Sequence, residues 1–348
     1  MELRAYIVRR LLLIIPVLFG VTLLIFALLQ LFSPVERVAL YVTSPRQFAS
    51  VPDMIAKYGL DQPVWVQYGR WISQIFQGNL GWSKVVSQPV TSAIINFLPA
   101  TLELAIFATP LIIFGGIFLG SKAAAHKDKA IDHATRLGAI VGWSLPTFWL
   151  GLMLLMVFYG LFTGLFPPER LSTEMNIVVH SEAFTQYTKL HFLDAILNGN
   201  GRVLLDSLRH LVLPVITLTI VSMAFIMRLM RSSMLEALGK GYILTARAKG
   251  LDENTVVSKH ARRNALIPVL TVSGYIFAGL VNGVVITETI FNYKGLGWWF
   301  WQSAVNLDVS GVLAFALFNG VLFVITNLVV DLLYARIDPR VRLGGKVT

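Results

Sequence analysis

Six long apolar segments alternate with polar stretches along the chain. All six are rich in aliphatic and aromatic residues and nearly free of charge, and they run from Leu11 to Phe32, Thr101 to Ser121, Leu137 to Phe166, Leu211 to Met227, Ala265 to Thr287 and Val309 to Val330. A bilayer core of about 30 Å requires about 20 helical residues, and each segment reaches or approaches that length. The pattern predicts an all-α integral membrane fold with six transmembrane helices.

Composition agrees with a membrane protein. Hydrophobic residues make up 55% of the chain and charged residues 14%, and the mean hydropathy is +0.68. An average soluble domain is far less apolar than this. The chain contains no cysteine, which excludes disulfide bonds and thiol chemistry.

Basic residues are unequally divided between the two sides that six crossings create. Nineteen of the 29 lysines and arginines fall within the 80 positions of 1–10, 122–136, 228–264 and 331–348, and ten fall within the 133 positions of 33–100, 167–210 and 288–308. Because lysine and arginine gather on the cytoplasmic side, both termini are predicted to be cytoplasmic. The net charge of +10 then reflects orientation, and no separate basic module indicates a nucleic-acid partner.

This topology divides the chain into three parts. Residues 1–34 form an N-terminal tail with the first membrane helix, residues 35–100 form a long extracytoplasmic segment, and residues 101–348 form a five-helix core with a cytoplasmic loop at about 240–264. Six aromatic residues of the extracytoplasmic segment predict interfacial helices with aromatic anchors: Tyr41, Tyr58, Trp65, Tyr68, Trp71 and Trp82. A contact surface for a soluble protein is the other interpretation, and both can hold.

Small residues within the apolar segments predict close helix packing. Three pairs of glycines have the G-x-x-x-G spacing that lets backbones approach: Gly116 with Gly120, Gly160 with Gly164, and Gly279 with Gly283. The spacing does not identify the partner helix.

Polar residues within the spans are few. Ser144 and Pro146 predict a kink that either faces a pore or serves only as a bend. Asn282 and Asn319 either line a passage or bond neighbouring helices, and Glu288 lies near the outer end of the fifth segment. The candidate translocation path consists of these five residues.

The sequence offers no energy source of its own. Glu103 and Glu288 lie near the ends of their segments, which argues against a path for protons or sodium ions through deeply buried carboxylates. No G-x-x-x-x-G-K-[ST] phosphate loop and no metal-binding motif is present. A transporter with these properties needs an energised partner, and the chain itself is not predicted to be an enzyme.

A polar and basic stretch from Tyr242 to Pro268 separates the fourth and fifth apolar segments. Asp252 can cap a short helix through Val256, Val257 and Ala261, and Gly250 just before it permits a sharp change of direction. We expect such a short helix to dock into a groove of a soluble partner. A solvated loop attracted to anionic headgroups is the simpler alternative.

This stretch carries a family resemblance. Ala246-Arg247-Ala248-Lys249-Gly250, followed by Arg263-Asn264-Ala265-Leu266-Ile267-Pro268, resembles the cytoplasmic loop of permease subunits from binding-protein-dependent ABC importers, in the oligopeptide and dipeptide branch. Similar runs extend over nearly the whole chain, among them Tyr58-Gly59-Leu60-Asp61-Gln62-Pro63 and Arg209-His210-Leu211-Val212-Leu213-Pro214. Ser33-Pro34-Val35-Glu36 departs from the Pro-Gly-Asp-Pro usual in this branch, which puts the shape of the first helix's exit in doubt.

The resemblance implies a multi-pass protein of the cytoplasmic (inner) membrane with three kinds of protein partner besides the lipid bilayer. These are a homologous second permease, two ATPase subunits that bind ATP and magnesium, and an extracytoplasmic substrate-binding protein. No cofactor is expected in this chain. The residues implied to couple to the ATPase are Arg247, Ala248, Lys249, Gly250, Leu251, Asp252, Glu253, Asn254, Val256, Val257 and Lys259.

The cargo implied by the resemblance is a dipeptide or an oligopeptide. Import of oligosaccharides by the same architecture stays open, since the cluster of Trp298, Trp299 and Trp301 would suit sugar stacking as well as membrane anchoring. A stand-alone channel or a secondary transporter is the alternative from another class.

Overall fold

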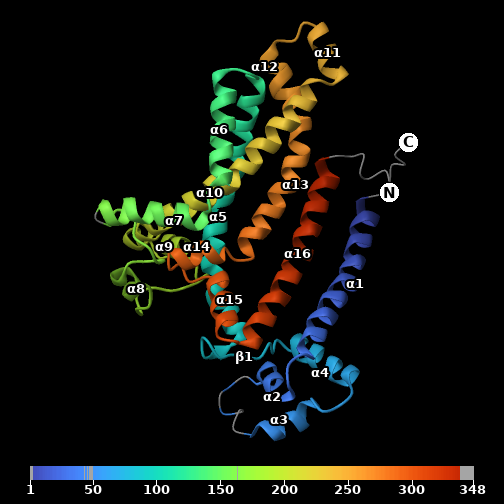
Figure 1. The fold of residues 1–348 in the computed structure, drawn as a ribbon, viewed down its shortest axis with the longest axis vertical. Helices are drawn as coiled ribbons and strands as arrows, with labels where there is room; N and C mark the ends of the chain where they lie inside the picture. The colour runs from blue at the N-terminus through green and yellow to red at the C-terminus, as the bar shows by residue number, and fades with distance from the viewer. Residues whose placement is uncertain (1–2, 43, 45, 47–49, 163, 338–348) are drawn as a thin grey trace.

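The computed structural model describes residues 3–42, 44, 46, 50–162 and 164–337. Five long helices dominate it, and Figure 1 shows them side by side in an elongated assembly. They are α1 (Leu3–Leu29), α5 (Val90–Ala125), α10 (Gly201–Leu238), α13 (Arg262–Val281) and α16 (Val309–Ile337). The basic residues Arg340, Arg342 and Lys346 lie outside the described residues.

The third predicted span is not one continuous helix. It is divided into α6 (Ala130–Ser144) and α7 (Thr147–Leu155), which meet at a bend of 95°. Pro146 lacks an N–H group and disfavours helical backbone at the residue before it, and Leu145 is accordingly extended. A π-helical turn, η3 (Met156–Leu161), follows. By length and composition the described residues contain five spans, or six if the bent pair forms one.

The fold is almost, but not entirely, helical. Two short antiparallel strands, β1 (Trp82–Ser83) and β2 (Gln88–Pro89), pair Trp82 with Pro89 and Ser83 with Gln88. Helix α5 begins at once after Pro89, whose backbone suits a helix start, and not at Thr101 where the apolar run begins. The boundary expected at residue 100 therefore falls inside a helix.

Short helices lie between α1 and the hairpin in the described residues of this stretch. They are α2 (Pro34–Arg37), η1 (Val38–Leu40), α3 (Val51–Tyr58) and α4 (Val64–Phe76). Their core includes Trp71 and Tyr41, packed with Phe26 of α1 and Leu313 of α16. Trp65 is exposed whereas Trp71 is buried, so the aromatic residues serve partly as a core and partly as surface.

The unusual exit from α1 has a clear local structure. The Ser33 side chain caps α2, and the Ser33 backbone N–H donates to the Glu36 carboxylate at 2.8 Å. This reciprocal capping box satisfies two helix-end donors. Ser33-Pro34-Val35-Glu36 therefore starts a helical turn directly after the first long helix.

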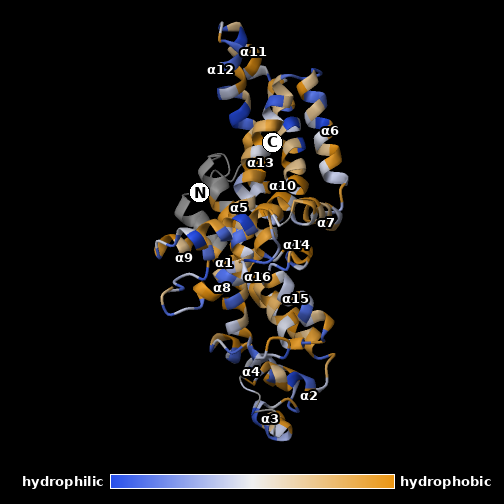
Figure 2. Ribbon diagram, turned by 90° about the vertical axis from the view of Figure 1, so that its left-hand side faces the viewer, coloured by the Kyte–Doolittle hydropathy of each residue, from blue (hydrophilic) through white to orange (hydrophobic). Residues whose placement is uncertain are grey.

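The remaining short helices of the described residues lie along the second half of the chain. They are α8 (Thr173–Val179), α9 (His191–Leu197), α11 (Gly241–Ala248), α12 (Glu253–Thr255), η4 (Val256–Ala261), α14 (Val285–Ile290) and α15 (Leu296–Val305), of which α11, α12 and η4 stand apart at one end. Figure 2 shows hydrophilic residues gathered at that end and apolar residues along the long helices.

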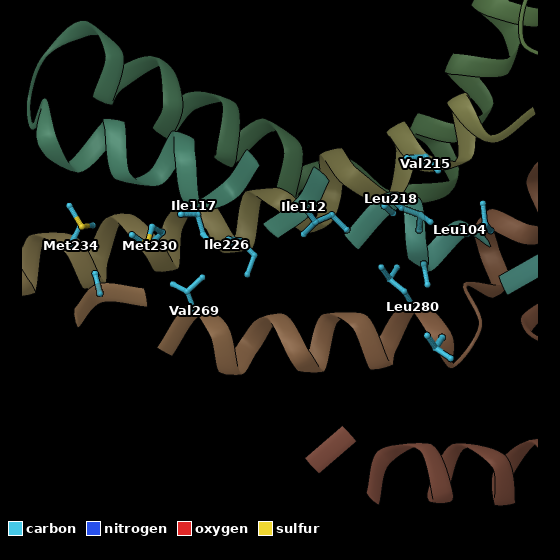
Figure 3. Packing of buried hydrophobic residues seen from close by; sticks show 14 of the residues in the cluster. Leu104, Ile112, Ile117, Val215, Leu218, Ile226, Met230, Met234, Val269 and Leu280 are labelled. Atoms are coloured by element: carbon cyan, nitrogen blue, oxygen red, sulfur yellow. The ribbon is translucent and has the colours of Figure 1, made fainter. Parts of the chain in front are cut away.

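The central packing interface joins α5 to α10. A methyl group added to Gly120 would lie 2.6 Å from the backbone oxygen of Met227, and one added to Gly116 would overlap the Ile226 side chain. Figure 3 shows buried side chains of both helices, among them Ile112 and Ile226, in a continuous row facing α13. The first glycine pair therefore lies at a close helix contact, as predicted, whereas Gly279 meets open space.

An ion pair ties α6 to α10 near the same interface. The Nε and Nη2 atoms of Arg231 donate to the two carboxylate oxygens of Asp132 at 2.6 and 2.7 Å. Asp132 is fully buried, and it also accepts from the backbone N–H of Asp128. Such a bidentate, charge-assisted pair fixes the angle between two helices.

Replacing Asp132 with asparagine should lower the melting temperature of the purified protein. The substitution keeps the shape of the side chain but removes the charge that Arg231 faces, at a cost of about 2 kcal/mol. Lys240→Gln is the matched control, because its 2.9 Å pair with Glu236 is exposed and such pairs contribute less than about 1 kcal/mol. Equal melting temperatures for the two variants would show that the buried pair adds no stability.

Candidate functional site

Residues 240–264, here called the central segment, form a compact turn between α10 and α13. Helix α11 runs to Ala248, Gly250 adopts a left-handed backbone with φ of +77°, and α12 then begins behind Asp252. The carboxylate of Asp252 accepts the Thr255 backbone N–H at 2.9 Å. The helix start and the turn predicted at these two residues are confirmed.

Charged side chains brace the turn from outside. Arg247 donates through Nε and Nη2 to the two carboxylate oxygens of Glu253 at 3.1 and 2.6 Å, which joins α11 to α12. Hydrogen bonding with Thr255 holds the pKa of Asp252 below its ordinary value, so the cap is charged at neutral pH.

The outer side of the central segment is open to solvent. Every residue from Arg247 to Asn254 is exposed, and so is Lys259. Two leucines interrupt this polar surface, Leu244 at 64% exposure and Leu251 at 40%. Exposed apolar side chains within a charged rim are typical of protein contact surfaces.

The inner side of the same segment is part of the main core. Ile243 and Val256 are fully buried, in one apolar cluster with Met234 of α10 and Val269 of α13. Figure 3 shows Met230, Met234 and Val269 in the row that continues toward the middle of the bundle. Val256, expected at the docking surface, supports the segment from beneath instead, and residues 256–261 form a π-helical turn.

The five residues of the candidate path lie on different elements. Ser144 ends α6, Pro146 marks the bend, Asn282 follows α13, and Asn319 donates to the Phe315 backbone oxygen within α16. No hydrogen bond joins any two of the five in the part of the chain that the structure describes. Their role in a path stays a prediction.

Glu288 is enclosed by protein. Its carboxylate accepts the Thr101 hydroxyl and the Trp298 backbone N–H, both at 2.7 Å, and its exposure is 0%. Gly295 and Gly297 lie so close that a methyl group on either would press against it. In this conformation Glu288 connects α14 to α5 and α15.

A second buried carboxylate was not expected to have charged partners. Glu103 of α5 accepts the Arg170 Nε–H at 2.7 Å and the Tyr293 hydroxyl at 2.6 Å, and the His191 backbone N–H also donates to it. These partners come from three distant parts of the sequence. No local pattern could have indicated the cluster.

The described residues contain no group of three histidine, aspartate or glutamate side chains placed to hold a metal ion. The polar residues of the central segment and of the Glu103 cluster are arranged for contact and packing. Comparison with known proteins identifies the class to which these features belong.

Residues 112–343 match the family described as binding-protein-dependent transport system inner membrane component. The chain is 42% identical over 297 residues to a probable D,D-dipeptide transport system permease protein of Escherichia coli K12, spanning 85% of this chain and 86% of the relative.

Two other relatives align over almost the full length. A dipeptide transport system permease protein of Alkalihalophilus pseudofirmus is 37% identical over 340 residues, and an oligopeptide transport system permease protein of Bacillus subtilis is 36% identical over 341 residues. Each alignment covers 97% of this chain and 99% of the relative. The chain belongs to the family of multi-pass inner membrane components of binding-protein-dependent transport systems, and to its dipeptide and oligopeptide permease branch.

Proposed function

We propose that this permease forms part of the translocation path of an ATP-driven importer for dipeptides or oligopeptides. Its partners are a second, homologous permease, two ATPase subunits that bind ATP and magnesium, and an extracytoplasmic substrate-binding protein. The names of the relatives support the peptide cargo. Coupling to the ATPases occurs through residues 240–264.

The proposed orientation has six crossings with both termini in the cytoplasm. The excess of basic residues in segments 1–10, 122–136, 228–264 and 331–348 supports it. Figure 1 adds that α11 and α12 lie at the opposite end of the molecule from α2, α3 and α4. The start of α1 and the end of α16 also lie on one side, as an even number of crossings requires.

One observation carries the coupling proposal: the central segment is exposed on one side and continuous with the core on the other. A partner that binds Leu244 and Leu251 on the outer side can pull on the whole segment. It then also displaces Ile243 and Val256, which are packed against α10 and α13. Close-packed interiors transmit such displacements because they have little free volume. Nucleotide-driven movement of an ATPase thereby reaches the membrane helices.

The alternatives have less support. For sugar import, the tryptophans after Gly297 would need to share one free surface. Trp301 is exposed, but Trp299 is buried, stacks on Phe97 and donates to the Ser83 hydroxyl at 3.2 Å. For a channel or secondary transporter, Glu103 and Glu288 would need access to ions, yet both are buried and hydrogen-bonded.

Replacing Leu244 or Leu251 with glutamate should uncouple the importer. Both side chains are exposed, so the permease itself should insert and fold normally. Loss of a buried apolar anchor at an interface costs about 1–2 kcal/mol or more, so we expect ATPase binding to weaken at least about tenfold. Co-purification of ATPase subunits and ATP-dependent uptake in proteoliposomes measure the effect.

Ile131→Glu is the control for this experiment. Ile131 is also an exposed apolar residue, in the first turn of α6 on the proposed cytoplasmic side, but outside the central segment. Coupling is assigned to the wrong surface if Ile131→Glu reduces ATPase binding as strongly as Leu251→Glu, or if neither leucine variant changes it.

A further inference from the structure

A polar cavity opens between α8, α9 and the residues after α14. Its volume is about 440 Å³, and three cationic side chains line it, Arg170, Lys189 and Lys294, together with the single carboxylate Glu169. Figure 1 shows α8, α9 and α14 grouped on one side of the assembly, away from α11 and α12. In the proposed orientation the cavity faces the extracytoplasmic side.

The cations of this cavity have unused hydrogen-bond donors. Arg170 donates its Nε–H to Glu103 and an Nη2–H to the Lys189 backbone oxygen, and the Tyr293 hydroxyl is a further side-chain partner. At most two of its five N–H groups are then without a partner in the described chain. Lys189 donates to the Asn96 side-chain oxygen at 2.6 Å, and Lys294 lies over the Trp298 ring, 5.6 Å from its centroid. The lining carboxylate Glu169 accepts from Asn292, not from any of these cations.

Glu103 holds Arg170 from behind the cavity. It is 1% exposed and does not line the cavity, so it neutralises one edge of the guanidinium without occupying the space in front of the other. Three cations and one anion line the cavity itself, which gives it an excess of positive charge. This excess of positive charge favours the binding of an anionic group.

His191 provides an independent sign of a missing ligand. The side chain is only 8% exposed, it lines the cavity, and its Nδ1 atom has no hydrogen-bond partner among the described residues. Buried polar atoms in folded proteins nearly always have a partner. Burial and the neighbouring Arg170 charge lower the pKa of His191 to about 2, so the ring is neutral and can donate one N–H without adding charge.

We propose that this cavity binds the C-terminal carboxylate of a short peptide, with Arg170, Lys189 and Lys294 as the charged partners and His191 as a neutral one. The same lining includes the side-chain amides of Asn96, Asn176 and Gln186, which can pair with peptide N–H and C=O groups. The volume is within the range of small-ligand sites. This inference rests on the proposed function, because it takes a peptide as the cargo.

A photoreactive peptide pair tests the proposal directly. The assembled permease and ATPase complex in nanodiscs, without the soluble binding protein, is illuminated with a diazirine tripeptide that ends in a free carboxylate, or with its C-terminal amide. Mass spectrometry maps the labelled residues. Charge-assisted hydrogen bonds contribute enough that the free peptide should label the cavity at about tenfold lower concentration than the amide.

Variants separate the carboxylate site from non-specific labelling. Lys189→Gln combined with Lys294→Gln should reduce the preference for the free peptide, since Arg170 is then the one charged partner left among the three, and His191→Phe should weaken labelling by the free peptide. Lys84→Gln makes the same charge change on an exposed lysine outside the cavity and should change nothing.

Several results would overturn the inference. They are equal labelling by both peptides in the wild type, an undiminished preference in the double lysine variant, and labelling confined to other regions. Weaker attachment of the binding protein in the variants, with no peptide preference in the wild type, would assign the cavity to an acidic side chain of that protein. Uptake is measured separately, with the same purified complexes in proteoliposomes and the binding protein added. No ATP-dependent peptide uptake by the wild type contradicts the proposed function, whereas uptake without cavity labelling contradicts this inference alone.

Discussion

Replacing Gly120 with valine will sharply reduce the amount of folded permease. The first added carbon would lie 2.6 Å from the Met227 backbone oxygen and 2.8 Å from the Met230 Cβ. A backbone oxygen cannot move aside as a flexible side chain can, so α5 and α10 must separate. Overpacking costs about 1–3 kcal/mol where side chains adjust, and we expect a larger loss here because the two helices share the main core.

Gly279→Val is the matched control for Gly120→Val. Both glycines belong to G-x-x-x-G pairs within apolar helices, but a side chain on Gly279 would meet nothing within 4 Å. Fluorescence-detected size exclusion of membrane extracts gives the folded yield, and a thermal ramp gives the melting temperature. Similar losses in both variants would mean that backbone conformation, and not contact between α5 and α10, explains the effect.

These two glycines show what sequence patterns can and cannot predict. All three glycine pairs have the same spacing, yet only in the first pair do both members, Gly116 and Gly120, lie against a neighbouring long helix. In the third pair Gly283 lies close to the Gly297 backbone, whereas Gly279 meets nothing within 4 Å. The spacing of the glycines shows which face of a helix carries small residues, whereas the contact depends on which helix lies opposite that face. That information is distributed over the whole chain.

The central segment was predictable because its rules are local. A capping aspartate acts on a backbone N–H three residues away, and a glycine with positive φ acts on its own turn. Asp252 and Gly250 follow these rules. Pro146 likewise marked a break, but the 95° angle between α6 and α7 depends on the contacts of α7 with distant elements.

Local rules of this kind could not predict the partners of the buried carboxylates. The sequence places Glu103 and Glu288 near the ends of apolar segments, which argued against an ion path but did not indicate their partners. In the structure both are enclosed, and their donors come from residues up to 190 positions away. We still expect that neither carboxylate forms part of an ion path, but for a different reason. Hydrogen-bond donors of the protein already contact both carboxylates.

The second large effect is expected at Glu103. Replacing Glu103 with alanine removes the acceptor of Arg170, of the Tyr293 hydroxyl and of the His191 backbone N–H at once. Arg170 is 17% exposed and has no other carboxylate within ion-pair distance in the described chain. Removing one partner of a buried ion pair costs about 3–5 kcal/mol, since the remaining charge is left uncompensated.

Glu103→Gln distinguishes the charge from the hydrogen bonds. The Tyr293 hydroxyl and the His191 backbone N–H donate to different oxygens of Glu103. The single amide oxygen of glutamine keeps one of these two acceptors and leaves Arg170 without a counterion, so the melting temperature of Glu103→Gln should fall between those of the wild type and Glu103→Ala. Arg170→Gln combined with Glu103→Gln removes both charges and should recover part of the loss, as a double-mutant cycle requires when the two residues interact. Additive losses in the double variant would show that Glu103 stabilises the junction of α5, α9 and the residues after α14 through packing alone, and that the pair with Arg170 contributes nothing.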